Sequence, residues 1–465
     1  MKRKYFWVIY CLFDWLSALC SWILFNYFRK VHVEKFPFEV NDKLIYSSII
    51  IPLVWILLYF VFGNYKNVYK RHRIKEVTQT VTQSFIGIIL IFFIFLLDDK
   101  INTYQDYYTL IISLFLLHTF LTLFPRFCIT TNIVNKIHHK KIGFPTLIIG
   151  SKQKAKEAYE EIQQLKKSTG HFFKGYISTN GGEDVMKLTR LEKLGDYNDL
   201  EYIINEYSIE EIIIATEPKE HEKINEIIND LADLNVKIKV IADMYNILTG
   251  SVKMNSIFGA LLISVNPEIM PPWQRHLKRI FDLVISFIAI IILFPLYILL
   301  SILIKTGTKG TIIFKQERIG YNGVPFYIYK FRSMYKNSEK NGPQLSSRND
   351  ERITPIGKLM RKSRLDEIPQ FFNVIKGNMS IVGPRPERKY FIDQIMDIAP
   401  HYKHLKKVKP GITSWGQVKY GYAENVEQMI DRLKFDLLYV ENMSFLLDMK
   451  ILFYTIIIML KGTGK

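Results

Sequence analysis

Four apolar stretches near the start of the chain constrain its fold more than any other feature. They lie at about 5–28, 44–63, 79–97 and 107–125, and each has about the 20 residues that a helix needs to span a bilayer. The first is not typical of a cleavable signal peptide, because it is long, lacks a small-residue cleavage site and is followed by further apolar runs. We therefore predict a transmembrane domain of four helices over residues 1–128.

Charges in the connecting loops predict the orientation of these helices. The 64–77 loop is rich in Lys and Arg, whereas the 98–106 loop is rich in Asp. Because positively charged loops stay in the cytoplasm, the chain after residue 126 is predicted to be cytoplasmic. Asp14 and His118 lie within the spans and are candidates for function, but a helix contact or an interfacial position is the favoured interpretation.

The composition agrees with a membrane protein that has basic soluble surfaces. Of 465 residues, 49% are hydrophobic, and 62 Lys and Arg exceed 44 Asp and Glu to give a formal net charge of +18. This excess suits membrane lipids or a phosphorylated substrate, whereas nucleic acid is not expected, because no zinc-finger spacing or RNA-binding aromatic motif is present. The cysteines Cys11, Cys20 and Cys128 indicate neither a disulfide framework nor a metal pair.

Residues 129–255 have the alternating pattern of a parallel α/β sheet. The runs FPTLIIGS, FKGYIS, EEIIIAT and VKIKVIA are typical of strands, with helical stretches such as KQKAKEAYEEIQQL between them. One glycine, Gly150, follows the first strand, whereas a dinucleotide fingerprint needs two or three there. We predict a degenerate Rossmann-like domain with a structural or assembly role, and dinucleotide binding is the less favoured alternative.

A fifth apolar run, residues 283–304, contains Pro295 in its middle, where proline breaks or kinks a helix. Both flanks are basic, with Arg275, Lys278 and Arg279 before the run and Lys305 and Lys309 after it. A straight crossing would leave one basic flank outside, so a re-entrant helix over 280–304 is favoured over an ordinary fifth span. The last apolar run is too short to span and is expected in the interface or packed on the domain.

The sequence RLDEIPQ places two adjacent carboxylates, Asp366 and Glu367, in a basic neighbourhood. One helix start is predicted at Pro355 and another near Pro369, with a stop at Gly377, so both acids precede the second helix. That position and the nearby arginines predict a lowered pKa for both acids. Adjacent side chains point in different directions, which favours divided roles: one acid could bind Mg²⁺ and the other could attack phosphorus. A solvated helix cap is the more ordinary reading of such a pair.

Other motifs in the last third carry cationic or rigid groups. VGPRPE holds Arg385 between Pro384 and Pro386, so a stiff backbone presents its guanidinium for phosphate binding. YIYKFRSM is predicted to be a strand that carries Lys330 and Arg332. The remaining candidates are the phosphate-binding residues Arg318, Arg361 and Arg364, and the loop residues Gly411 and Trp415, which could wall a nucleotide site or simply pack.

Residues 276–465 closely resemble the bacterial sugar transferase family, the polyprenyl-phosphate hexose-1-phosphate transferases, also called monotopic phosphoglycosyl transferases. The matching motifs, in order and at the family's spacing, are KRIFD, QERIG, YKFRSM, RLDEIPQFFNVIKGNMSIVGPRP and KPGITSWGQV. With four spans and an α/β domain in front, the whole chain looks like the large members of this family, which initiate exopolysaccharide, capsule or O-antigen synthesis.

The resemblance implies transfer of a sugar 1-phosphate from a UDP-sugar to undecaprenyl phosphate, with release of UMP, at the cytoplasmic face of the bacterial inner membrane. It implies that Asp366 is the nucleophile of a phospho-sugar aspartate, that Glu367 holds Mg²⁺, that Arg385 binds phosphate and that Pro295 breaks the re-entrant helix. Large members suggest a homodimer. The alternatives are a non-catalytic scaffold or regulator of polysaccharide assembly, and a conventional glycosyltransferase that would release UDP.

The predicted fold therefore has three parts. Residues 1–128 form an α-helical transmembrane bundle of four spans, and residues 129–255 form a Rossmann-like α/β domain with a parallel sheet. Residues 256–465 form a mixed α/β catalytic domain on a re-entrant membrane helix.

Overall fold

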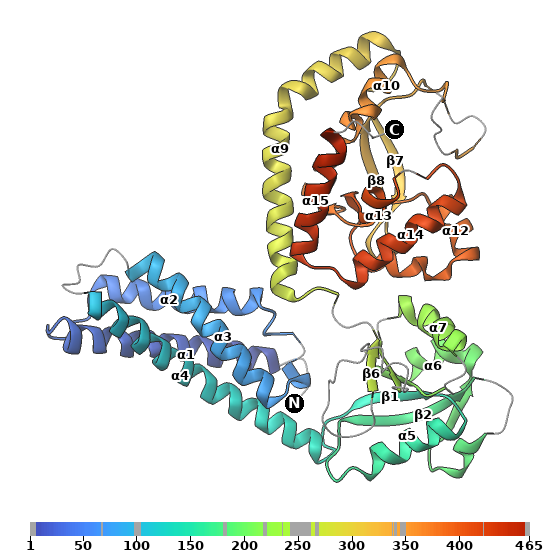
Figure 1. Ribbon diagram of the computed structural model, residues 1–465. Helices are drawn as coiled ribbons and strands as arrows, with labels where there is room; N and C mark the ends of the chain where they lie inside the picture. The colour runs from blue at the N-terminus through green and yellow to red at the C-terminus, as the bar shows by residue number, and fades with distance from the viewer. Residues whose placement is uncertain are drawn as a thin grey trace. The chain divides into compact units, whose positions relative to one another are not determined.

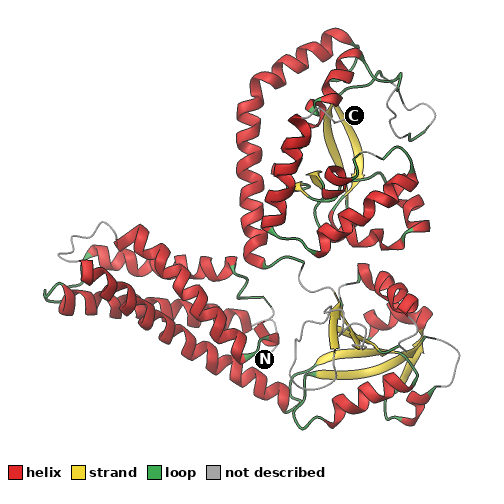
Figure 2. Cartoon of the chain, viewed as in Figure 1, coloured by secondary structure: helices red, strands yellow, loops and turns green. Residues whose placement is uncertain are grey.

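The computed structural model describes residues 6–66, 68–96, 104–179, 184–216, 221–234, 236–241, 262–265, 269–336, 338, 342–344, 350–421 and 423–460. Residues 98–103 of the acidic loop and the predicted boundary at residue 255 lie outside these ranges. Contacts within the chain form two compact units, Met1–Ala215 with Lys239–Ile263, and Thr216–Ile238 with Ser264–Lys465. Figure 2 shows that both units combine helices with strands.

Four long helices form the N-terminal bundle, as the apolar stretches predicted. They are α1 (Phe6–Phe28), α2 (Asp42–Val61), α3 (Arg73–Ile91) and α4 (Tyr104–His138), with π-helical turns at Arg29–Val33 and Phe92–Leu96 and a short 3₁₀ turn at Val68–Lys70. All four are long and apolar enough to cross a membrane. Figure 1 shows them packed side by side, and Trp22, Trp55 and Ile88 lie in their shared core.

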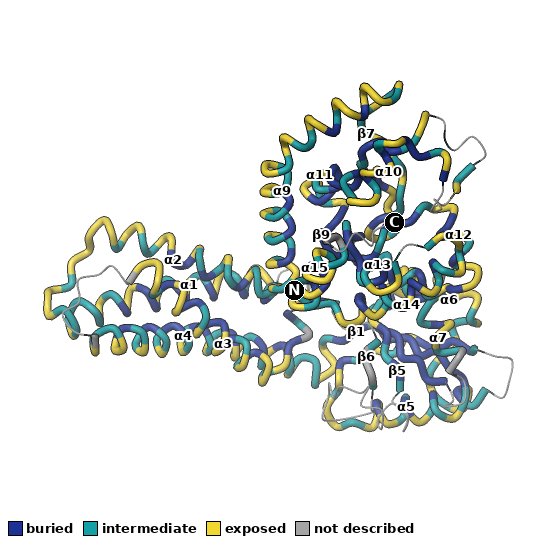
Figure 3. The backbone as a smooth tube through the Cα atoms, turned by 45° about the horizontal axis from the view of Figure 1, so that its top comes forward, coloured by how far each residue is buried: buried dark blue, intermediate teal, exposed yellow. Residues whose placement is uncertain are grey.

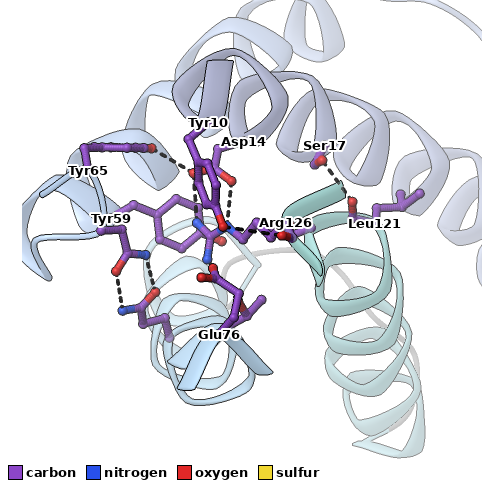
Figure 4. Close-up of polar contacts among 12 residues, drawn as sticks. Tyr10, Asp14, Ser17, Tyr59, Tyr65, Glu76, Leu121 and Arg126 are labelled. Carbon is purple, nitrogen blue, oxygen red and sulfur yellow. Dashed lines mark hydrogen bonds and ion pairs between the residues drawn. The ribbon is translucent and has the colours of Figure 1, made fainter. Parts of the chain in front are cut away.

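A cluster of charged side chains is buried where α1, α3 and α4 meet (Figure 4). Arg126 of α4 donates from Nε and Nη2 to the two carboxylate oxygens of Asp14 on α1, at 2.7 and 2.9 Å. Arg126 also donates to Thr80 Oγ1 on α3 at 3.1 Å. Because a buried carboxylate needs a paired cation, this contact holds α1 against α4 and accounts for an acid inside a span.

His118 on α4 also makes its contacts inside the bundle. Its ring stacks on Trp55 of α2, with 3.6 Å between the ring centroids. Its two ring nitrogens lie 3.0 Å from Ser21 Oγ and 2.8 Å from the Tyr59 hydroxyl. Asp14 and His118 are therefore helix-contact residues, which is the interpretation favoured from the sequence.

The sheet domain has six strands in the order β3-β2-β1-β4-β5-β6. Their bounds are β1 (Phe144–Ile149), β2 (His171–Ser178), β3 (Lys193–Asp196), β4 (Glu211–Ile214), β5 (Lys237–Ile241) and β6 (Leu262–Val265). β1 pairs in parallel with β2 and β4, and β2 with β3, which confirms the predicted parallel sheet. Its helices are α5 (Gln153–Gln164) and α6 (Leu200–Glu206), with 3₁₀ turns at Val185–Leu188 and Tyr197–Asp199. Between β4 and β5 the chain forms α7 (His221–Asp230) and a 3₁₀ turn at Leu231–Asp233, which are grouped with the second unit.

Close packing requires a glycine at position 150, directly after β1. Its φ is +143°, and a Cβ at this position would collide with the carbonyl oxygen of Ala215, directly after β4. Only glycine allows two strand ends to approach this closely in that backbone conformation. The glycine is thus explained without a bound phosphate.

The C-terminal part of the second unit is a mixed α/β domain. α9 (Pro272–Gly307) leads into an antiparallel ribbon of β7 (Ile313–Ile319) and β8 (Pro325–Phe331), and β9 (Ser380–Val382) pairs in parallel with β10 (Gly411–Thr413). The helices are α10 (Pro355–Lys362), α11 (Gln370–Lys376), α12 (Lys389–Ile398), α13 (Trp415–Lys419), α14 (Val426–Glu441) and α15 (Phe445–Leu460), with 3₁₀ turns at Tyr321–Gly323, Leu365–Glu367 and Pro400–Lys407. Its core includes Val374, Met379, Ile392 and Leu433.

The long helix α9 contacts this domain near both of its ends. Near its start, Lys278 Nζ forms a 2.7 Å ion pair with Asp448 of α15, and Asp282 accepts a 2.8 Å hydrogen bond from Ser380 of β9. Near its end, Leu300 and Ile304 share a buried cluster with Phe331 and Met360. Many apolar side chains between these contacts are exposed, and Figure 3 shows exposed stretches along α9.

The backbone remains helical through Pro295, so the predicted break does not interrupt the helix. Figure 1 shows instead that α9 bends in its C-terminal half. The final apolar run forms α15, in which Thr455 Oγ1 lies 2.8 Å from Thr413 Oγ1 of β10, and the Phe445 ring meets Phe281 of α9. It therefore packs back on the domain, one of the two positions expected for it.

Candidate active site

Asp366 and Glu367 lie in a buried 3₁₀ turn between α10 and α11, as the local sequence predicted. Thr354 caps α10 by accepting a 3.0 Å hydrogen bond from Gly357 N. α11 ends at Gly377, whose φ of +88° is the left-handed conformation that glycine favours. These two signals, a Thr-Pro start and a glycine stop, are local and readable in the sequence.

Arg364 turns the chain into this site. It has a φ of +55°, a left-handed conformation that an arginine adopts only at a cost of about 1 kcal/mol. Such strain in a non-glycine residue persists only where the surrounding structure imposes it, and it gathers at functional sites. Only Leu365 separates Arg364 from the two buried acids, so the strained residue lies at the entrance to the turn that carries them.

The acids meet Lys330 because α11 is hydrogen-bonded to β8. Asn373 of α11 accepts from the Tyr329 backbone N–H at 3.0 Å and donates to the Tyr327 carbonyl at 2.7 Å. This holds Lys330, the next residue of β8, beside the turn. Lys330 Nζ then lies 2.6 Å from Glu367 Oε1, a short charge-assisted contact between a half-buried lysine and a buried carboxylate.

Arg385 approaches the same carboxylate from the loop after β9. Its Nη1 lies 3.6 Å from Glu367 Oε1. The loop is held in place because Gly383 N donates to the Thr413 carbonyl at 3.0 Å and Gly411 N donates to the Pro384 carbonyl at 2.9 Å. A Cβ on Gly411 would collide with Gly383, so this glycine is required for the close approach of the two segments.

The pKa values of the two acids are shifted in opposite directions, which corrects the prediction that both have a lowered pKa. Burial raises the pKa of Asp366 to about 6, and its cationic neighbours, Lys330 first, offset only part of that effect. Burial alone would also raise the pKa of Glu367, but Lys330 and Arg385 outweigh burial and lower it to about 2. Glu367 therefore holds the ionised charge more firmly, as expected for the acid that is ion-paired.

The remaining cationic candidates take different positions. Arg361 donates from Nε to Ser333 Oγ at 2.9 Å, and its charge acts to lower the pKa of Asp366. The charge of Arg364 acts to lower the pKa of Glu367. These two arginines therefore belong to the surroundings of the acid pair, together with Lys330 and Arg385.

Arg332 and Arg318 make their hydrogen bonds to structural partners. Arg332 donates from Nη2 to the Thr308 carbonyl at 2.9 Å and to Thr308 Oγ1 at 2.7 Å, which satisfies the end of α9. Arg318 donates from Nη1 to the Pro386 carbonyl at 3.1 Å and to Glu387 Oε2 at 3.2 Å. Arg332 is thus engaged at the helix end, and Arg318 supports the loop that carries Arg385.

Trp415 packs inside the domain. It begins α13, its ring lies 6.2 Å from that of Tyr454 on α15, and Lys419 lies over its face at 5.0 Å. Of its two predicted possibilities, packing is the one with contacts in the structure. Sequence reasoning did not single out Asn373, which links α11 to β8, or Glu387 and its partner Arg432, although Asn373 and Glu387 both lie within motifs noted in the sequence.

The donor set fits a magnesium ion that is shared with substrate phosphates. Among the described residues, no group of three or more His, Cys, Asp or Glu side chains could enclose a metal by itself. Mg²⁺ commonly takes only one or two protein carboxylates and completes its shell with water and phosphate oxygens. Glu367 is the carboxylate of the pair that would hold the ion, although its Oε1 also accepts from Lys330.

Comparison with known proteins decides the family. Residues 273–462 match the family described as bacterial sugar transferase, and residues 61–242 match a family described as CoA-binding domain. The chain is 30% identical over 359 residues to the UDP-galactose-lipid carrier transferase of Erwinia amylovora, covering 73% of this chain and 72% of that protein. The chain belongs to the bacterial sugar transferase family. The Asp366–Glu367 site lies wholly within the segment that matches this family.

Two further relatives show how similarity is distributed along this sugar transferase. The N-acetylgalactosaminephosphotransferase of Aeromonas hydrophila that acts with undecaprenyl phosphate is 42% identical over 217 residues, covering 47% of this chain and 51% of that protein. The undecaprenyl-phosphate galactose phosphotransferase of Salmonella typhimurium is 29% identical over 475 residues, covering 97% and 94%. The chain spans about half the length of the first curated relatives that it matches.

Proposed function

We propose that this protein transfers a sugar 1-phosphate from a UDP-sugar to undecaprenyl phosphate, releases UMP and so forms undecaprenyl-diphospho-sugar. The observation that carries the proposal is a buried acid pair, Asp366 and Glu367, surrounded by the cations Lys330 and Arg385. The names of the relatives, which are sugar phosphotransferases that act on undecaprenyl phosphate, support the same reaction. The reaction would initiate the synthesis of a surface polysaccharide at the cytoplasmic membrane face.

The proposed mechanism gives Asp366 the role of nucleophile. One carboxylate oxygen of Asp366 forms a bond to the sugar-proximal phosphorus of the UDP-sugar, and the bond from that phosphorus to the UMP oxygen breaks with its electron pair. An oxygen of undecaprenyl phosphate then attacks the same phosphorus, and the bond to Asp366 breaks. Asp366 suits this role better than Glu367, because Glu367 is already ion-paired with Lys330.

The cations around the pair act on the phosphate charges. Arg385 and Lys330 lie beside the acids, so they can neutralise the developing charge on the diphosphate in a site that largely excludes water. Glu367 is the proposed ligand of Mg²⁺, and the ion, when bound, supplies further neutralisation of phosphate oxygens. Each of these groups acts by position and charge, which is what phosphoryl transfer chiefly requires.

Nucleotide release tests this proposal. Purified protein in detergent would be incubated with Mg²⁺, undecaprenyl phosphate and a panel of UDP-sugars that includes the glucose, galactose and N-acetylgalactosamine donors named for the relatives. We expect UMP from at least one donor. Release of UDP would indicate a conventional glycosyltransferase, and no release from any donor would favour the scaffold alternative.

We also propose that α9 is re-entrant and keeps the catalytic domain on the cytoplasmic face. Two observations support it: both ends of α9 contact the same folded domain, and Tyr297 in the apolar run donates a 2.8 Å hydrogen bond to the Ile368 carbonyl, next to the active-site turn. A helix that crossed the bilayer would have to carry one of these contacts to the far side. An ordinary fifth span is the alternative, since α9 is long and apolar enough to cross.

Cysteine labelling of the two flanks of α9 tests the re-entrant topology. Arg275 and Lys309 are both exposed and lie at opposite ends of the helix, whereas Lys278 is buried and unsuitable as a probe. Single Arg275→Cys and Lys309→Cys variants would be made after replacing Cys11, Cys20 and Cys128 by serine. We expect a membrane-impermeant maleimide to label both only from the cytoplasmic side. Labelling of position 309 from outside would establish a fifth span.

A further inference from the structure

Glu387, which follows the Pro-Arg-Pro segment, is a buried carboxylate that faces three arginines. It is 4% exposed. Its Oε1 accepts from Arg432 Nη2 of α14 at 2.6 Å, and its Oε2 accepts from Arg318 Nη1 of β7 at 3.2 Å. The third arginine is Arg385, whose Nε lies 4.0 Å from Oε1. One carboxylate therefore connects β7, α14 and the loop of the candidate active site.

Glu387 is itself held in place by contacts of its side chain and of its backbone. Arg432 is also buried, and Ile319 N donates to the backbone carbonyl of Glu387 at 3.0 Å. Burial alone would raise the pKa of Glu387, but the three guanidinium groups outweigh it and lower this pKa. The carboxylate is therefore ionised and held from both its side-chain and its backbone atoms.

Glu387 also contributes to the position of Arg385. Pro384 and Pro386 stiffen the backbone on either side of Arg385, but the arginine side chain has several rotatable bonds that the prolines do not restrain. Its guanidinium lies between two carboxylates, with Nη1 3.6 Å from Glu367 and Nε 4.0 Å from Glu387. Neither contact is short, so the guanidinium is held between the two acids and is not closed tightly on either.

We propose that Glu387 is a positioning residue: it holds the Arg385 guanidinium between the two carboxylates, in the orientation that receives the diphosphate of the substrate. The proposal rests on the proposed function, in which Arg385 binds phosphate. Under this proposal, the effect of Glu387 on anion binding is the opposite of the effect that its negative charge alone would have. As a simple negative charge near the site, Glu387 would weaken anion binding; as a positioning residue, it strengthens anion binding through Arg385.

A binding cycle with inorganic pyrophosphate tests this inference. Pyrophosphate carries the diphosphate chemistry, and its Kd would be measured by calorimetry on the full-length protein in detergent for the wild type, Glu387→Gln, Arg385→Gln and the double variant. We expect Glu387→Gln to weaken binding by about 10-fold although it removes a negative charge. We expect the same change to alter Kd by less than about 2-fold when Arg385 is already glutamine, because coupled residues are not additive.

A variant and a control separate positioning from general destabilisation. Glu387→Gln leaves buried arginines without their partner and could prevent folding. A second variant therefore combines Glu387→Gln with Arg432→Met, which restores the net charge. It is compared with Arg432→Met alone. Asp448→Asn is the matched control, because Asp448 is likewise buried and ion-paired, 2.7 Å from Lys278, but is not paired with Arg385. We expect it to lower the melting temperature while changing the pyrophosphate Kd by less than about 2-fold.

The outcomes separate this inference from the proposed function. Equal or tighter pyrophosphate binding by Glu387→Gln, or an equal loss with and without Arg385, would overturn the positioning role even if the wild type releases UMP. The opposite result is coupling between Glu387 and Arg385 in a protein that releases no UMP from any donor. This result would support the anion site and overturn the proposed reaction.

Discussion

Asp366→Asn is expected to reduce UMP release by about 10⁴-fold or more, because the variant removes the proposed nucleophile and leaves an amide of nearly the same shape. Protein folding should be unaffected, since loss of a carboxylate whose pKa is raised by burial removes a group that is costly to ionise in the interior. The rate would be measured with the donor that the wild type uses, alongside the melting temperature of both proteins.

A covalent-trapping experiment accompanies this measurement. With a donor labelled in its sugar-proximal phosphate and without undecaprenyl phosphate, the wild type should retain label after denaturation and Asp366→Asn should retain none. The Asp448→Asn control should trap label as the wild type does. An Asp366→Asn variant that keeps more than about a tenth of the rate would exclude this residue as the nucleophile, since loss of a nucleophile is far more costly than that.

Glu367→Gln is expected to lower kcat/KM by about 10³-fold, which corresponds to about 4 kcal/mol of transition-state stabilisation. Two roles contribute to this expectation: Glu367 is the proposed ligand of Mg²⁺, and it is the ion-pair partner of Lys330 at 2.6 Å. The variant should also need more Mg²⁺ for half-maximal rate, because an amide oxygen binds this cation less well than a carboxylate does.

Lys330→Gln distinguishes the two roles of Glu367. If Glu367 serves only as the partner of Lys330, both variants will lose similar activity and show the same dependence on Mg²⁺. If Glu367 holds the ion, only Glu367→Gln will shift that dependence, and calorimetric titration with Mg²⁺ and UMP will show weaker metal binding for this variant alone. An unchanged Mg²⁺ titration in Glu367→Gln would remove Glu367 from the proposed metal site.

Local signals in the sequence predicted the place of the acid pair well. Thr354, Pro355 and Gly377 define the ends of α10 and α11 through capping and backbone preferences that act within a few residues. The four apolar helices and the parallel sheet followed in the same way from patterns along the chain. Strands β3 and β6 were missed, whereas β4, which also has four residues, was predicted because its run of Ile residues is continuously apolar.

Contacts between distant segments could not be predicted. Lys330 and Arg332 are two residues apart and would share one face of a strand, but β8 ends at Phe331, and Arg332 turns to the carbonyl groups at the end of α9. The raised pKa of Asp366 arises from burial, which depends on how the whole domain packs. Arg432 lies on α14, and nothing in its local sequence indicates that it meets Glu387.

The hydrogen bond from Tyr297 to the Ile368 carbonyl has a consequence for how a lipid substrate is found. It joins the apolar part of α9 directly to the residue after Glu367. If α9 lies in the bilayer as proposed, it therefore sets the depth of the proposed catalytic carboxylates. Under the proposed topology, the phosphate of undecaprenyl phosphate and the active site occupy the same layer. The lipid then reaches the enzyme by lateral diffusion, a search in two dimensions, and its long hydrocarbon chain never has to leave the membrane.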